Sequence, residues 1–107
     1  MKTEPRPGEV YFVDLGMAAK PRMVLIVSVH DPSCPLAVAT GLSLTRQFHQ
    51  SRYEVALPKL PWMREYSFVN AQSLAAFKYV ELQRMVGQLD ATVVAEVQDA
   101  VGAWLGL

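Results

Sequence analysis

Arginines and hydroxyl side chains are the residues of this chain that are best suited to do chemistry. A guanidinium can hold a phosphodiester through two parallel hydrogen bonds and stabilise the charge of its transition state. A nearby Ser or Thr hydroxyl can donate a hydrogen bond to a phosphate oxygen. Residues 20–64 hold six basic residues and two acidic ones, a net charge of +4: Lys20, Arg22, Arg46, Arg52, Lys59 and Arg64 against Asp31 and Glu54.

This basic segment is balanced by an acidic end. Residues 81–107 have one basic and four acidic residues, a net charge of −3, and the whole chain has ten of each. A neutral chain can therefore still present a local anion-binding face. Ordinary scatter of surface charge is the simpler explanation when the count is taken alone.

The chain lacks the residue patterns that other kinds of catalytic site require. The glycines are isolated, without the spacing of a phosphate-binding loop. The two histidines form no metal-binding motif, so neither a metal nor a cofactor is expected. Cys34 and His30 could form a reactive pair, but a plain surface cysteine is the favoured interpretation. A solvated His49 is likewise favoured over a catalytic one.

Length and composition indicate one soluble, cytoplasmic domain over residues 1–107. The chain is 51% hydrophobic, which excludes a disordered segment. No apolar run reaches the roughly 18 residues of a membrane span, and the N-terminus lacks the apolar stretch of a secretory signal. A core of this modest size makes homo-oligomerisation a natural supplement.

Short strands followed by one helix must position the candidate side chains. Their β-branched and aromatic residues predict strands over residues 9–15, 22–29, 36–44, 53–57 and 66–69. The second of these is nearly continuously apolar and is expected to be buried on both faces. Gly41 suggests a bulge or a close backbone approach in the third. Residues 71–77 continue or add a strand, and residues 78–85 could form either a short helix or a strand.

The last segment has the clearest helical pattern. Asp90 occupies an N-cap position and Gly106 a C-terminal stop. The apolar residues of its stripe are Val93, Val94, Val97, Ala100, Val101, Trp104 and Leu105. The prediction is a mainly β fold, in which five or six strands form a small, partly open antiparallel barrel with the C-terminal helix packed on it.

In this order, the segments resemble the MazF/PemK (Kid) toxins of type II toxin–antitoxin systems. Residues 8–16 (GEVYFVDLG) resemble the opening strand of the family, and residues 20–28 (KPRMVLIVS) resemble its second strand. Residues 53–55 match the short strand after the family's variable loop. Residues 67–72 are similar to a stretch that ends in Asp-Gln in the family, and residues 82–105 match its C-terminal signature. The match spans nearly the whole chain, although no single motif is specific.

The resemblance implies a fold, an activity and partners. The fold is an SH3-like barrel of the CcdB/MazF/PemK type, usually in a homodimer. The activity is that of a metal-independent, sequence-selective endoribonuclease acting on single-stranded RNA such as mRNA. The RNA 2′-hydroxyl attacks the adjacent phosphate and leaves a cyclic phosphate, and a cognate antitoxin protein covers the RNA groove. Trp62, Met63 and the apolar C-terminus are candidate dimer contacts.

The resemblance also implies roles for individual residues. Arg22 falls on the catalytic arginine, which would stabilise the charge of the phosphorane. Ser43 falls on the catalytic hydroxyl after the third strand, and Thr45 replaces it if the register shifts by one pleat. The residues expected to bind RNA are Lys20, Thr45, Arg46, Arg52 and Gln72.

Three departures from the family pattern leave a second function open. Residues 17–21 form a shorter connection that lacks a Gly-Ser-Glu element, and Met23 replaces the usual proline. Ala71 occupies the position of an Asp that takes part in acid/base work in some members. The alternative is a catalytically degenerate or CcdB-like module that binds RNA, an antitoxin or gyrase without cleavage. The C-terminal helix with Trp104 is similar to that of CcdB, although core or dimer packing is the simpler role for this residue.

Overall fold

The computed structural model describes residues 4–14, 16 and 20–107. In chain order, the elements of this part are β1 (Glu9–Val13), β2 (Arg22–Ile26), β3 (Val38–Ser43), β4 (Glu54–Ala56), β5 (Phe68–Asn70), the 3-10 helix η1 (Ala71–Ser73), β6 (Ala75–Lys78), the 3-10 helix η2 (Tyr79–Glu81), β7 (Leu82–Gln88) and α1 (Ala91–Leu105). The sequence left the secondary structure of residues 71–77 and 78–85 open. Each of these segments forms a 3-10 helical turn that is followed by a strand. The described part of the chain holds no helix with the length and hydropathy to span a bilayer.

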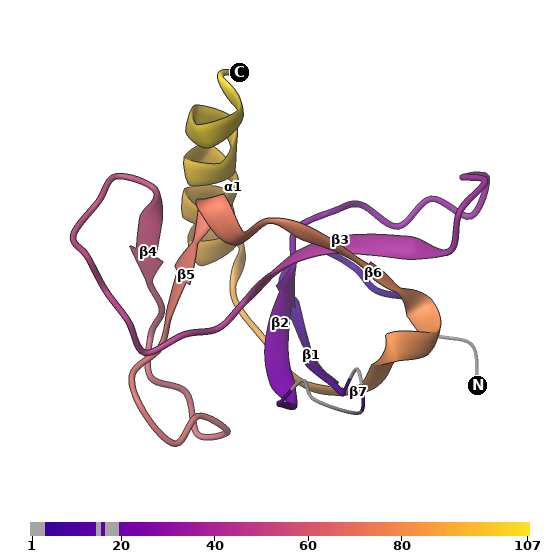
Figure 1. Ribbon diagram of the computed structural model, residues 1–107, viewed down its shortest axis with the longest axis horizontal. Helices are drawn as coiled ribbons and strands as arrows, with labels where there is room; N and C mark the ends of the chain where they lie inside the picture. The colour runs from indigo at the N-terminus through magenta and orange to yellow at the C-terminus, as the bar shows by residue number, and fades with distance from the viewer. Residues whose placement is uncertain (1–3, 15, 17–19) are drawn as a thin grey trace.

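Five of the strands form one antiparallel sheet, in the order β6-β3-β2-β1-β7, and β4 pairs with β5 in a second, small sheet. Figure 1 shows the larger sheet curled into an incomplete ring. This arrangement confirms the predicted partly open antiparallel barrel with a C-terminal helix. The prediction of five or six strands was too low, because the segments after residue 71 contribute β6 and β7.

Apolar side chains cover both faces of β2. Side chains alternate between faces along a strand, so Leu25 packs in one core with Val10 and Leu42. Val24 and Ile26 pack on the opposite face, in a second core inside the curl of the sheet. All three β2 residues are 0% exposed, which confirms the prediction of a strand buried on both faces.

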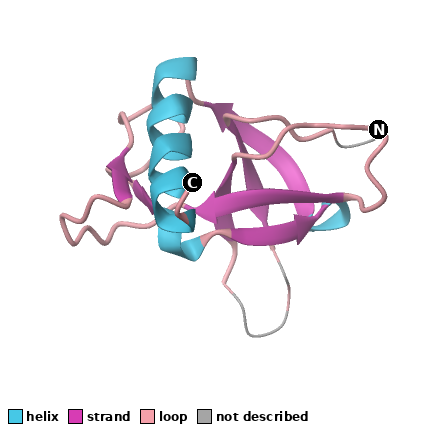
Figure 2. Ribbon diagram, turned by 90° about the horizontal axis from the view of Figure 1, so that it is seen from above, coloured by secondary structure: helices cyan, strands magenta, loops and turns pink. Residues whose placement is uncertain are grey.

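Helix α1 joins the two sheets. Its N-cap Asp90 accepts a hydrogen bond from the amide of Val93 at 3.0 Å, and Gly106 ends it in the left-handed region with φ 75°. Val97 and Ala100 are buried in the core that both sheets share. Figures 1 and 2 show the helix standing beside the small sheet and against one side of the curled sheet. The predicted N-cap and C-terminal stop are confirmed.

The connection between β4 and β5 folds inward, against the sequence prediction. Met63 was predicted as an exposed dimer contact, but it is only 3% exposed and packs in the core. Trp62 is half-buried and lies against Gly87 of β7, where a side chain would collide with the indole. The prediction was wrong for Met63 because the loop packs on an apolar surface that its own sequence does not reveal.

Candidate functional site

The register between β2 and β3 places Arg22 beside Thr45. Val24 pairs with Ser43, and the next rung is a 2.8 Å hydrogen bond from the amide of Leu44 to the carbonyl of residue 23. Continuing this antiparallel register by one residue would set Arg22 opposite Thr45, which itself pairs with Phe68 of β5. Directly opposed residues point to the same face of a sheet. Two residues that are far apart in the sequence thus lie at the same end of the two strands, where β2 begins and β3 has just ended.

A cleft of about 530 Å³ opens at this place. Its lining residues are Lys20, Pro21, Arg22, Met23, Leu44, Thr45, Arg46, Arg64, Glu65 and Ser67. Four of them are basic and one is acidic. The volume falls within the range of small-molecule and substrate sites, and the excess of positive charge favours an anionic ligand.

The arginines of the cleft differ in what they bind. Arg46 donates to the carboxylate of Glu65 at 2.7 Å, and this hydrogen bond raises the pKa of Arg46. Both side chains are exposed, so the pair adds little to stability. Arg22 and Arg64 have no carboxylate within 4 Å among the described residues. Their guanidinium groups are therefore available to a ligand.

Backbone hydrogen bonds fix the position of Thr45 and the orientation of its hydroxyl. Its amide and carbonyl both bond to Phe68, at 2.9 and 2.7 Å, which ties the residue to β5. Its Oγ1 accepts a hydrogen bond from the amide of Gln47 at 3.2 Å. Since this bond uses the oxygen as an acceptor, the hydroxyl proton is free for a group in the cleft. Ser43 lies one pleat further along β3 and does not line the cleft.

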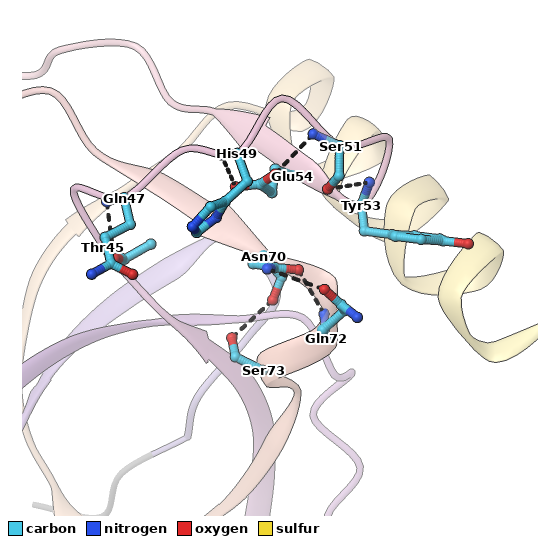
Figure 3. Close-up of polar contacts among 9 residues, drawn as sticks. All are labelled: Thr45, Gln47, His49, Ser51, Tyr53, Glu54, Asn70, Gln72 and Ser73. Atoms are coloured by element: carbon cyan, nitrogen blue, oxygen red, sulfur yellow. Dashed lines mark hydrogen bonds and ion pairs between the residues drawn. The ribbon is translucent and has the colours of Figure 1, made fainter.

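A polar band extends from Thr45 over the small sheet, and Figure 3 shows Gln72 at the end of the band away from Thr45. The amide of Gln72 donates to Oδ1 of Asn70 at 3.0 Å, and the hydroxyl of Ser73 donates to the Asn70 carbonyl at 2.8 Å. These bonds build the turn η1. The predicted RNA-binding residue Gln72 is therefore held by this turn and lies outside the cleft.

Arg52 also lies outside the cleft. Its guanidinium carbon is 5.0 Å from the centroid of the Tyr53 ring, and this ring packs edge-on against Trp104 of α1 at 5.3 Å. The predicted RNA-binding set thus divides in two. Lys20, Thr45 and Arg46 line the cleft, whereas Arg52 and Gln72 belong to the surface near the helix.

One buried carboxylate shapes the loop that carries Thr45 and Arg46. The side chain of Glu54 is 2% exposed and accepts from the amides of His49 at 2.7 Å and Ser51 at 2.9 Å. Although burial opposes ionisation, these amides lower the pKa of Glu54 to about 2. The ring of His49 lies 3.4 Å from the same carboxylate. Glu54 therefore holds residues 49–51 against β4. The His49 side chain is exposed, as expected, but it also lies beside the Glu54 carboxylate.

Ala71 stands where the resemblance expects an Asp. It is 1% exposed and packs in the core beside α1, and its amide donates to the carbonyl of Tyr53 at 2.8 Å. The cleft carboxylate is instead Glu65, which the sequence analysis did not single out. Among residues 4–14, 16 and 20–107, no three His, Cys, Asp or Glu side chains gather as a metal site would require.

Arg64 and Ser67 also line the cleft, although the sequence alone did not assign them to the site. The sequence signal for a role of Arg64 was its position in the basic segment, residues 20–64. The signal did not say that Arg64 lies near Arg22, because the inward fold of residues 58–67 brings it there.

Comparisons with solved structures show the same fold. An endoribonuclease in complex with its cognate antitoxin, from a mycobacterial species, is 25% identical, with a TM-score of 0.82 and coverage of 96% of each chain. MazE-MazF from Deinococcus radiodurans is 19% identical, with a TM-score of 0.81 and coverage of 98% of each chain. The Mycobacterium tuberculosis toxin MazF-mt6 is 21% identical, with a TM-score of 0.78 and coverage of 92% of this chain and 97% of that one.

Sequence comparison points to the same group. No curated protein sequence matches the chain significantly. The family model of PemK-like, MazF-like toxins of type II toxin–antitoxin systems matches residues 6–105, which is nearly the whole chain. Together with the barrel, its C-terminal helix and the basic cleft, this match shows that the chain belongs to the PemK-like, MazF-like toxins of type II toxin–antitoxin systems.

Proposed function

We propose that this chain is a toxin that cleaves single-stranded RNA as a metal-independent endoribonuclease. The observation that carries the proposal is the placement of Arg22 beside Thr45 in a cleft with four basic residues. Arg22 has no carboxylate partner among the described residues, so it can bind a phosphate without first breaking an ion pair. The mycobacterial endoribonuclease that shares the fold supports the same activity.

In the proposed reaction, the RNA supplies its own nucleophile. The 2′-oxygen bonds to the adjacent phosphorus, the bond from phosphorus to the 5′-oxygen breaks, and a cyclic phosphate and a 5′-hydroxyl result. Arg22 donates two hydrogen bonds to the non-bridging oxygens, which carry increasing negative charge. The free hydroxyl proton of Thr45 donates to a phosphate oxygen of the same group.

The reaction also needs a group that accepts the 2′-hydroxyl proton. We assign this role to Glu65, the one carboxylate that lines the cleft in the described part of the chain. Its ion pair with Arg46 at 2.7 Å orients its carboxylate at the edge of the cleft. Water returns a proton to the departing 5′-oxygen. Replacing Glu65 by Gln should lower kcat more than it changes KM, because the amide cannot accept the proton.

The decisive experiment is cleavage of a fluorescent single-stranded RNA by purified protein in the presence of EDTA. We expect cleavage that stops when the scissile nucleotide is replaced by its 2′-deoxy form, because the nucleophile is then missing. Arg22→Ala should abolish cleavage. Arg6→Gln is the matched control, since Arg6 is exposed, lies outside the cleft and pairs with Glu4. Intact RNA in EDTA and in Mg²⁺ alike would exclude the proposal.

A module that binds without cleaving is the second candidate, and Ala71 is the observation that favours it. The missing Asp removes one acid/base group that the family resemblance implies, and Ala71 is packed in the core. This candidate predicts that the protein binds RNA, an antitoxin or gyrase and leaves RNA intact. The cleavage experiment separates the two candidates directly, and a gyrase pull-down tests the CcdB-like version.

We propose three further properties of the toxin. Its partner is a cognate antitoxin protein, encoded by a small open reading frame beside its gene, and the antitoxin should inhibit cleavage. The protein acts in the cytoplasm, where its RNA substrate is found. It forms a homodimer, for which the exposed apolar end of α1 with Trp104, Leu105 and Leu107 is the candidate contact. Sedimentation equilibrium of the purified protein tests the dimer.

A further inference from the structure

A second hollow lies next to the cleft of Arg22. Its volume is about 480 Å³, and it shares Pro21, Arg22, Met23 and Arg64 with the first. Its other lining residues are Phe12, Trp62, Arg84, Met85 and Val86. The two hollows therefore meet at the residue that we place at the scissile phosphate.

Strand pairing builds the floor of this second hollow. Phe12 of β1 pairs with Met23 of β2 on one side and with Arg84 of β7 on the other. Directly opposed residues share a face, so the three side chains form a row across three strands. The guanidinium carbon of Arg84 lies 5.0 Å from the centroid of the Phe12 ring. Phe12 and Arg84 together present an aromatic and cationic surface to the hollow.

The indole of Trp62 lies at the same hollow. Trp62 sits on β7 at Gly87, where there is no side chain to displace it. The same loop supplies Arg64, so one inward-folded segment contributes both an aromatic ring and a guanidinium. Neither Arg64 nor Arg84 has a carboxylate within 4 Å among the described residues, and the hollow has no acidic lining residue in that part of the chain.

This combination matches the chemistry of a nucleotide. Aromatic rings stack on bases of any sequence, and guanidinium groups bind phosphates through paired hydrogen bonds. A polynucleotide with one phosphate at Arg22 must continue past Arg22, and the second hollow begins there. We propose that the second hollow is a subsite for the nucleotide next to the scissile phosphate. Its base stacks on Trp62, and Arg84, which lies over the Phe12 ring, binds its phosphate.

The subsite rests on the proposed function, because it binds a neighbouring part of the same RNA. It predicts a dependence on substrate length. Cleavage of a dinucleotide, whose only phosphate is the scissile one, should be the same in Arg84→Gln and in the unaltered protein, because the phosphate that Arg84 binds is missing. Cleavage of an RNA extended by several nucleotides should lose about tenfold or more in kcat/KM, as expected when one charge-assisted contact is removed.

The experiment compares the unaltered protein, Arg84→Gln and Arg84→Lys on a dinucleotide and on RNAs extended at the 5′ or the 3′ end. The substrate whose cleavage depends on Arg84 identifies the side on which the subsite lies. Arg84→Lys keeps the charge but not the paired donors, so it should restore part of the loss. Arg6→Gln again serves as the control, because it removes an exposed arginine outside both hollows.

Three results would overturn the subsite. Equal loss on short and extended substrates would mean that Arg84 acts on the chemistry or the fold. No loss on either would mean that the hollow binds no nucleotide. Unchanged RNA kinetics with weaker inhibition by the antitoxin would mean that the hollow binds an acidic protein segment instead.

The subsite and the ribonuclease proposal can fail separately. If the unaltered protein does not cleave RNA, fluorescence anisotropy with a 2′-O-methyl oligonucleotide still measures binding. Weaker binding by Arg84→Gln would then support the subsite while the ribonuclease proposal fails. Binding unaffected by Arg84→Gln would overturn the subsite on its own account.

Discussion

Replacing Thr45 by Val should slow RNA cleavage by roughly ten- to 150-fold. Valine keeps the shape of the side chain and removes only the hydroxyl. A hydrogen bond to a charged group contributes about 1.5–3 kcal/mol, and each 1.36 kcal/mol of barrier is about tenfold in rate. The fold should tolerate the change, because the hydroxyl accepts only from the exposed amide of Gln47, which water can satisfy.

The assay is single-turnover cleavage of a fluorescent RNA in EDTA, with thermal unfolding measured for each variant. Ser43→Ala is the matched comparison, since Ser43 lies one pleat away and does not line the cleft. The Ser43→Ala variant should cleave RNA at a rate close to that of the unaltered protein. Both variants should unfold near the temperature of the unaltered chain.

The opposite pattern would refute the reasoning. If Ser43→Ala slowed cleavage and Thr45→Val did not, the register that sets Thr45 opposite Arg22 would not describe the catalytic state. Equal small effects in both variants would mean that a hydroxyl is not needed and that Arg22 acts without one.

Three predictions concern stability. Gly41→Ala should cost about 1–3 kcal/mol in urea unfolding, because the new Cβ would lie 2.7 Å from the Leu25 carbonyl oxygen; an unchanged midpoint would contradict this close approach. Glu54→Gln should flatten the pH dependence of stability between about 4.5 and 2: the folded pKa is the lower one, so the contribution is present above the unfolded value and lost as pH falls, and an unaltered acid limb would argue against it. Asp90→Ala should cost about 1 kcal/mol in thermal unfolding through loss of the N-cap bond to Val93, and Asp90→Asn should retain most of it.

Local sequence patterns predicted the elements whose geometry depends on neighbours along the chain. The apolar run of β2, the Asp90 cap and the Gly106 stop were all confirmed. For Gly41 the sequence predicted either a bulge or a close backbone approach. The structure shows the close approach, between Gly41 and the backbone of Leu25 in β2. Strand ends were less accurate, since the second strand was expected over residues 22–29 and ends at Ile26.

Segments with mixed signals were decided by long-range pairing. Residues 71–77 and 78–85 form helical turns followed by β6 and β7, and these two strands take opposite edges of the large sheet. No local pattern separates helix from strand there, because the strands are stabilised by partners such as β3 and β1 from elsewhere in the chain.

The sequence by itself determined the family, the mainly β architecture with its C-terminal helix, and the types of residue available for phosphate chemistry. Only the tertiary structure decided which of them meet. Pairing of β2 with β3 brings Thr45 to Arg22, and inward folding of the loop after β4 adds Arg64 and Trp62. The physical reason is that composition and periodicity report local preferences, whereas a site depends on the register between strands far apart in the sequence. A shift of one residue would turn a strand side chain such as Arg22 to the other face.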